Sequence, residues 1–160
     1  MKILNKLFLA FAVVFLLASC KSSQETATYI PLNFDVEVLN LGVDDKNNQR
    51  LSVTTSANDK DAVFERAKIE ALRDMIFIGF INGSEVVEPI ITEYNARAIY
   101  NDYFNKFLSK NGAYKNYVEL DENSEPELIA KTSKEVAYKV VVLINTGKLR
   151  KKLIEDGVLK

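Results

Sequence analysis

The stretch from Glu135 to Ile144, EVAYKVVVLI, decides the fold of this 160-residue chain. In an extended chain its side chains alternate between two faces, and both faces are largely apolar. The first face carries Val136, Tyr138, Val140 and Val142, and the second carries Ala137, Val141 and Leu143. A strand that is apolar on both faces is typical of the middle of a sheet with both sides covered. We therefore predict a central strand over 135–144.

Shorter runs of alternating or apolar residues predict four further strands, at 34–38, 50–56, 114–120 and 128–132. The polar residues 44–49 separate the first two of these strands and favour a turn. We therefore expect an N-terminal hairpin, and three strands close together in the C-terminal third of the chain.

A long helix is predicted between these two groups of strands, over 60–80. Asn58 or Asp59 can cap its start, and Asn82-Gly83 can end it. We expect its inner stripe to be Phe64, Ala67 or Lys68, Ala71, Met75 and Ile78, flanked by Val63, Leu72 and Ile76.

A second helix is predicted over 90–109, after Pro89 and before Asn111-Gly112. A short third helix is predicted over 147–155, closing at Gly157. The resulting order indicates an α+β fold, with a mostly antiparallel sheet, two main helices packed on it and a short C-terminal helix. We expect residues 32–160 to form this fold as a single domain, because that length buries enough surface to need no disulfide or metal.

The composition argues against several kinds of function. The 21 Lys and Arg residues nearly balance the 22 Asp and Glu residues, and no dense basic surface of the kind that binds nucleic acids is visible. The sequence contains no histidine, the commonest general base and metal ligand, and only one cysteine. We expect no cofactor, no metal and no nucleic-acid partner.

The first 19 residues have the three parts of a secretion signal. Lys2 and Lys6 make the start positive, residues 7–17 are an unbroken apolar run, and Ala18 and Ser19 are small. That apolar run is too short to cross a bilayer, which takes about 20 helical residues. We therefore expect residues 1–19 to be a signal peptide.

The four residues Leu17-Ala18-Ser19-Cys20 resemble the lipobox of bacterial lipoproteins. The resemblance implies cleavage between Ser19 and Cys20, a diacylglyceryl thioether on Cys20, and acylation of the new amine by a fatty acid such as palmitate. Two or three acyl chains anchor a protein stably, whereas one chain binds a membrane only marginally. The alternatives are an ordinary secreted protein and a short membrane helix with an incidental cysteine.

Residues 20–31 are expected to be the lipidated start of the mature protein and a flexible tether, because residues 21–28 are polar and aperiodic. Residue 21 is Lys. In envelopes with two membranes, Asp at this position resembles an inner-membrane retention signal, so Lys21 favours the outer membrane. We expect a lipid-anchored protein of the cell envelope, whose partners are the membrane and other envelope proteins.

The segment 61–72, DAVFERAKIEAL, resembles the alanine-spaced helix of small envelope lipoproteins and of the amino-terminal domains of flagellar-ring proteins. Ala62, Ala67 and Ala71 supply its small residues, at imperfect spacing. The resemblance extends over about 100 residues. It implies a hairpin feeding a helix, and a structural or assembly role rather than an enzymatic one. The long aromatic second helix and the missing glycine before the first helix depart from that pattern.

The aromatic residues of the predicted second helix are the candidate contact surface. Tyr94, Tyr100, Tyr103 and Phe107, together with Phe104, offer more aromatic area than one buried stripe needs. Exposed aromatic side chains often mark partner surfaces. Core packing, with tyrosine hydroxyls reaching solvent, explains the same residues.

Three functions are compatible with these features. The main expectation is a non-enzymatic structural, assembly or binding module, which a flat aromatic patch would favour. The alternative is a periplasm-facing carrier or inhibitor of a small apolar or peptide ligand, which a deep apolar pocket beside Tyr103 and Phe107 would favour. The least favoured is a carboxylate-only hydrolase, for which Glu119, Asp121 and Glu122 are the candidate acids.

Overall fold

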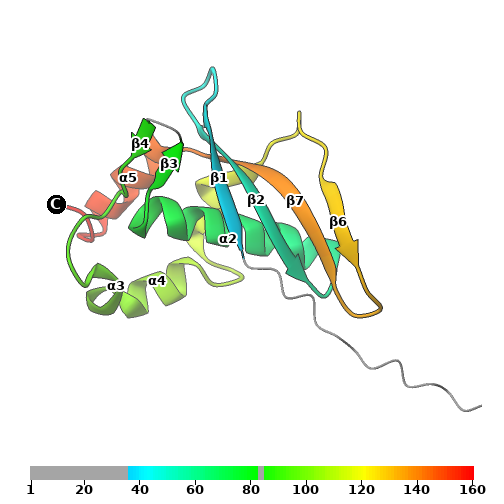
Figure 1. Ribbon diagram of the computed structural model, residues 1–160. Helices are drawn as coiled ribbons and strands as arrows, with labels where there is room; N and C mark the ends of the chain where they lie inside the picture. The colour runs from blue at the N-terminus through cyan, green and yellow to red at the C-terminus, as the bar shows by residue number, and fades with distance from the viewer. Residues whose placement is uncertain (1–35, 83–84) are drawn as a thin grey trace, which may run out of the picture.

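The computed structural model describes residues 36–82 and 85–160. The predicted signal peptide, Ser19, Cys20 and the predicted tether lie outside this part of the chain, and so do the first residues of the strand predicted at 34–38. The described chain forms a five-stranded antiparallel sheet with helix α2 across one face (Figure 1). The strands of this sheet are β1 (Glu37–Val43), β2 (Gln49–Ala57), β5 (Val118–Leu120), β6 (Glu127–Lys131) and β7 (Val136–Ile144).

The predicted central strand is confirmed as β7. It pairs with β2 on one side and with both β5 and β6 on the other. The register places Leu51 beside Val142 and Val53 beside Val140, and all four side chains are buried beneath α2. The expectation that both faces are covered is wrong, because no described helix or strand lies over the opposite face of the sheet (Figure 1).

Helix α2 (Lys60–Phe77) begins where the sequence predicts. The Asp59 carboxylate caps it by accepting the N–H of Ala62 at 2.8 Å. Six of its side chains are buried: Val63, Ala67, Ala71, Leu72, Met75 and Ile76. The alanines let the helix lie close to the sheet. The prediction that Ile78 points inward is wrong, because the helix ends at Phe77 and Ile78 is 60% exposed.

The end of α2 is closed by backbone hydrogen bonds. Ile78 and Gly79 both donate to the carbonyl of Asp74, and Gly79 turns the chain at a φ of +75°. Farther along the chain, the N–H groups of Ile90 and Ile91 donate to the carbonyls of Met75 and Ile76 at 3.0 and 2.9 Å. Helix ends leave such carbonyls unpaired unless the following chain returns to them.

Two departures from the predicted elements follow from this closure. Strands β3 (Phe80–Asn82) and β4 (Glu85–Val87) form a small hairpin where the helix was expected to continue to residue 80 and then stop. The single helix predicted over 90–109 is also wrong. The structure instead has two short helices there, α3 (Ala96–Ile99) and α4 (Asn101–Phe107). The helix cannot begin at residue 90, because Ile90 and Ile91 are hydrogen-bonded to the end of α2 and the backbone of Asn95 is left-handed.

The C-terminal third follows the prediction with one change. Residues predicted to start a strand at 114 instead form a 3-10 helix, η1 (Ala113–Asn116), and β5 begins only at Val118. Tyr114 in η1 is fully buried, and its hydroxyl donates to Glu65 of α2 at 2.5 Å. Helix α5 (Thr146–Glu155) closes at Gly157, as expected.

Candidate functional site

The structure brings together only two of the four aromatic residues proposed as a contact surface. Tyr94 is 88% exposed in the loop before α3, and Tyr100 is half-buried at the junction of α3 and α4. Tyr103 and Phe107 lie one turn apart on α4, with their rings stacked at 5.6 Å between centroids. The predicted surface is therefore reduced to the Tyr103–Phe107 pair.

A third ring extends this pair into a stack that sequence reasoning missed. Tyr117, between η1 and β5, lies against Phe107 with 5.8 Å between centroids and 25° between planes. Phe107 is buried in the middle, whereas Tyr103 and Tyr117 at the two ends are half-buried. The stack packs the α4 region against the end of the sheet and keeps two tyrosine edges at the surface.

A groove of about 800 Å³ opens beside this stack. Residues from α4, the loop that follows it, η1 and α5 line it: Tyr103, Lys106, Phe107, Ser109, Asn111, Gly112, Ala113, Asn116, Lys152 and Asp156. The volume is in the range of small-ligand sites, about 300–1,000 Å³. The groove is broad and half-open, so it is neither the flat patch nor the deep pocket considered from the sequence.

A polar cluster adjoins the aromatic rings in the groove and is held in place by hydrogen bonds. The hydroxyl of Tyr103 donates to Asp156 at 2.7 Å, and the ammonium of Lys152 donates to the same carboxylate at 2.8 Å. The bond from Lys152, followed by that from Tyr103, lowers the pKa of Asp156, and the same contact raises the pKa of Lys152. Burial, with help from Asp156, raises the pKa of Tyr103. The groove therefore presents a neutral phenol and a closed ion pair at neutral pH.

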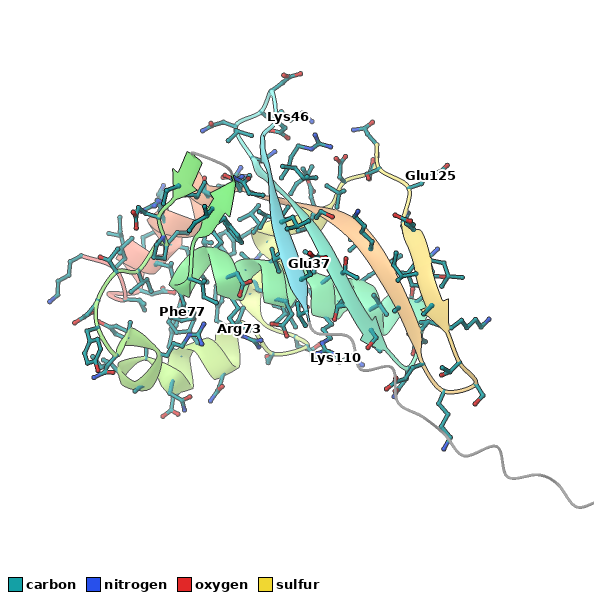
Figure 2. All side chains as sticks on the ribbon, in the orientation of Figure 1. Glu37, Lys46, Arg73, Phe77, Lys110 and Glu125 are labelled. Atoms are coloured by element: carbon teal, nitrogen blue, oxygen red, sulfur yellow. The ribbon has the colours of Figure 1, made fainter. Side chains whose placement is uncertain are left out.

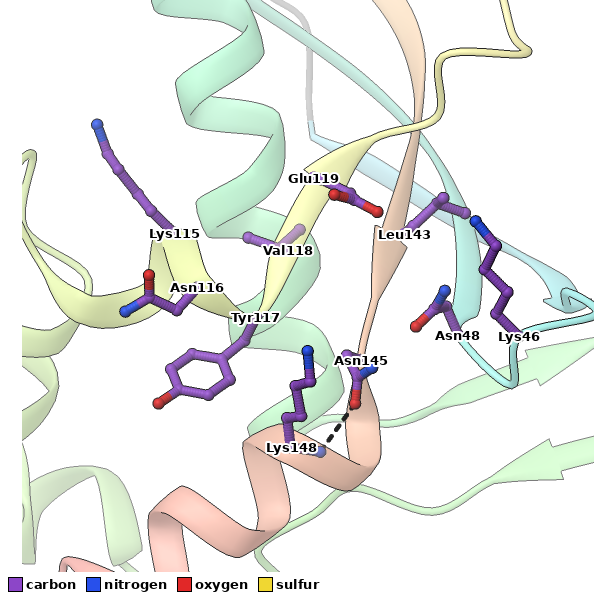
Figure 3. Close-up of a pocket in the computed structure, with 10 residues that line it drawn as sticks. All are labelled: Lys46, Asn48, Lys115, Asn116, Tyr117, Val118, Glu119, Leu143, Asn145 and Lys148. Atoms are coloured by element: carbon purple, nitrogen blue, oxygen red, sulfur yellow. Dashed lines mark hydrogen bonds between the residues drawn. The ribbon is translucent and has the colours of Figure 1, made fainter.

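A second hollow of about 260 Å³ adjoins the groove and shares Asn116 with it (Figure 3). Three lysines line this hollow, namely Lys46, Lys115 and Lys148. Figure 3 shows their ammonium groups pointing in different directions. The side chain of Asn145 caps α5 there by accepting the N–H of Lys148 at 2.8 Å. The lysines do not converge on one point, so we do not treat this hollow as an anion site.

The acids considered for a hydrolase lie around β5. Asp121 is buried, and the backbone N–H of Asn123 and the guanidinium of Arg50, at 3.0 Å, lower the pKa of its carboxyl. Glu119 and Glu122 are exposed. A general acid needs a raised pKa, so Asp121 is better explained as a structural ion pair between β5 and β2.

Two searches of residues 36–82 and 85–160 returned negative results. Within these ranges no cluster of three or more acidic or cysteine side chains could hold a metal ion. No helix among the same residues has both the length and the apolar character needed to cross a bilayer.

The residues that complete the groove carry only a faint signal in the sequence. Lys152 and Asp156 are spaced four residues apart, which places them on one face at the end of the C-terminal helix. Nothing in that spacing says which other segment of the chain this face meets. Comparison with known proteins finds no matching protein family, no matching curated protein and no matching solved structure.

Proposed function

We propose that this chain is a lipid-anchored lipoprotein of the cell envelope, and that its folded domain is a non-enzymatic binding module. The lipobox ending at Cys20 supports the anchor, since it follows a positive start and an apolar run too short to span a bilayer. Lys21 favours the outer membrane as the site of anchoring. The likeness of segment 61–72 to helices of envelope assembly proteins supports a role among other envelope proteins.

The observation that carries the binding role is the groove beside Tyr103 and Phe107. Its lining combines aromatic rings with an adjoining polar cluster, in which Tyr103, Asp156 and Lys152 are already paired with one another. Covering such a cluster costs less free energy than covering unpaired charges, because each charge keeps its partner. Lys106, Asn111 and Asn116 at the edge can form hydrogen bonds with a backbone.

A half-open groove of this size and lining suits a peptide segment of another protein that inserts an apolar side chain against the aromatic wall. This geometry is also compatible with the second function, a carrier or inhibitor that holds a small apolar or peptide ligand. The two differ in whether the bound segment belongs to an envelope partner or diffuses freely. The first is our proposal, because a tethered domain meets other envelope proteins at high local concentration.

The anchor is tested by replacing Cys20 with Ala in cells that make the full chain. We expect the variant to lose incorporation of labelled palmitate and to accumulate as the uncleaved precursor. Normal labelling and normal processing of Cys20→Ala would contradict the anchor.

The binding role is tested with a photo-activated cross-linking amino acid at position 106, in the groove. The matched control places the same amino acid at Lys151, which is exposed on α5 but does not line the groove. We expect a discrete product from position 106 that position 151 does not give. Product size and mass spectrometry then distinguish an envelope protein from a short peptide. No product from position 106, or the same products from both positions, would contradict a groove-specific function.

A further inference from the structure

The sheet has one face that α2 does not cover, and the register defines its residues. Among described residues, Glu37 pairs with Thr54, and Thr54 pairs with Lys139. One row farther along, Leu39 pairs with Ser52, and Ser52 pairs with Val141. Directly paired residues point to the same side of a sheet. The open face is therefore made of these six side chains, together with Glu127 of β6, which pairs with Lys139, and with Arg50 and Leu143 in the row beyond. Leu41 adjoins them at the irregularity of β1 between Asn40 and Val43.

The open face exposes large apolar side chains. Leu39 and Leu41 on β1 are 46% and 45% exposed, and Val141 and Leu143 on β7 are partly exposed. They form two apolar columns, one on each side of β2. Antiparallel sheets with one solvated face normally place polar side chains there. Leucine and valine in these positions are typical of a face that another surface covers.

Between them, the two β2 residues in the paired rows have small side chains. Ser52 and Thr54 lie between the leucines of β1 and the β7 side chains. Ser52 is only 4% exposed, and its hydroxyl has no hydrogen-bond partner in the described structure. Stacked sheets pack about 10 Å apart, and the small side chains of Ser52 and Thr54 allow two sheets to come that close.

We propose that the open face binds the same face of a second copy of this chain, about a two-fold axis that runs along β2. Such an axis places β1 of each copy over β7 of the other. Because Glu37 and Lys139 flank β2 in one row, each Glu37 meets the Lys139 of the second copy. In the next row each Leu39 meets the second copy's Val141, and Ser52 meets Ser52.

The charges on the open face favour a second copy over a lipid surface as its occupant. Glu37 is exposed on β1, on the side of the sheet away from α2 (Figure 2), and Lys139 is exposed at the same level on β7. When an acid and a base lie at equal distances on either side of a two-fold axis, the acid of each copy faces the base of the other. This row carries two acids, Glu37 and Glu127, against one base, Lys139, so its net charge repels an anionic membrane. The backbone of Arg50 lies near the axis, but its guanidinium reaches beyond β7 to Asp121 of its own chain, which neutralises it at 3.0 Å.

The size of the contact sets its strength. Three strands at about 4.8 Å spacing and about six residues at about 3.4 Å cover on the order of 300 Å² in each copy. Contacts of this size are transient. The dimer should therefore form measurably when the copies are concentrated, as they are on a shared surface.

The first test cross-links two differently tagged full-length chains made in the same cells. One carries Glu37→Cys and the other Lys139→Cys, and a short bismaleimide is the probe. We expect a product that contains both tags. The matched control pairs Lys139→Cys with Glu127→Cys, which is in the same row but on β6, on the far side of β7 from the axis. Equal products from both pairs, or none from the first, would overturn the proposed register.

The second test exchanges the charges and measures self-association of the purified full-length chain by sedimentation. Glu37→Lys and Lys139→Glu should each weaken the dimer by about tenfold, because two attractive pairs become repulsive. The double exchange should restore the dimer, while Glu155→Lys, at an exposed position on α5 outside the sheet, should leave it unchanged. Neither side chain is buried, so each variant should keep its circular dichroism spectrum. If the double exchange fails to restore association while both single variants lose it, the pairing is wrong.

Discussion

Replacing Gly79 with Ala should destabilise the fold far more than the removal of one glycine ordinarily does. Gly79 follows α2 with a φ of +75°, a conformation that side chains rarely adopt. A Cβ built on it would lie 2.3 Å from the carbonyl oxygen of Val87 and 2.9 Å from the ring of Pro89. Both neighbours belong to the segment that returns from β4 to the end of α2, so neither can move without disturbing the hydrogen bonds of Ile90 and Ile91.

The magnitude has two parts. The left-handed conformation costs an alanine about 1–2 kcal/mol relative to glycine. Forcing a methyl group into a packed site costs about 1–3 kcal/mol more. We expect Gly79→Ala to lower the free energy of unfolding by about 2–5 kcal/mol, a large fraction of the stability of an ordinary domain.

The chain supplies a matched control for this experiment. Gly157 has a φ of +72°, and a Cβ there would meet nothing within 4 Å. Gly157→Ala should therefore lose only the conformational part, about 1–2 kcal/mol. Urea unfolding followed by circular dichroism measures both values. If Gly79→Ala is no more destabilising than Gly157→Ala, the close approach of β4 to the end of α2 is refuted.

Three further predictions concern capping, pH and the groove. Asp59→Ala should lower the free energy of unfolding by about 1 kcal/mol while Asp59→Ser keeps most of it, because serine can also cap α2; equal losses in urea unfolding would contradict the cap. Burial alone would raise the pKa of Glu65, but hydrogen bonds from lysines and a tyrosine lower it to about 2. The stabilising effect of ionised Glu65 should therefore be complete above about pH 4.5 and disappear towards pH 2. In acid titrations, the difference in stability between wild type and Glu65→Gln should become smaller over that range. A constant difference would contradict the ionised contact. In the groove, Tyr103→Phe loses a hydrogen bond to a charged group and should cost about 1.5–3 kcal/mol, whereas Phe107→Ala should cost about 3–5 kcal/mol. A reversed order in thermal unfolding would show that the buried ring is not the anchor of the stack.

The elements that could be predicted are those whose own residues carry a local sequence pattern. Helix α2 carries a cap and apolar side chains at helical spacing, and β7 is apolar at nearly every position. The broken second helix was not predictable in this way. The N–H groups of its first residues, Ile90 and Ile91, donate to the carbonyls of Met75 and Ile76. This contact joins residues far apart in the sequence, so local periodicity does not predict it. Tertiary hydrogen bonding overrode a helical pattern that was locally sound.

The candidate site was half predictable for the same reason. Tyr103 and Phe107 are one helical turn apart, so their pairing follows from their spacing. Tyr117, Lys152 and Asp156 reach the site from other segments of the chain. Their positions depend on how η1 and α5 pack against α4, and the residue pattern of a single sequence does not predict that packing. The covered second face of β7 was a wrong prediction, because an apolar pattern says that a face avoids water but not which molecule shields it.

The position of β7 near the end of the chain has a consequence for how a nascent chain behaves. Before residues 136–144 emerge, the main sheet consists of β1 and β2 alone, and a two-stranded hairpin is marginally stable in water. At about 5–20 residues per second of synthesis, β2 waits on the order of 5–20 s for the strand that completes it. During that interval the main sheet is incomplete. A translocation channel that passes only unfolded chains would therefore not have to unfold a domain first.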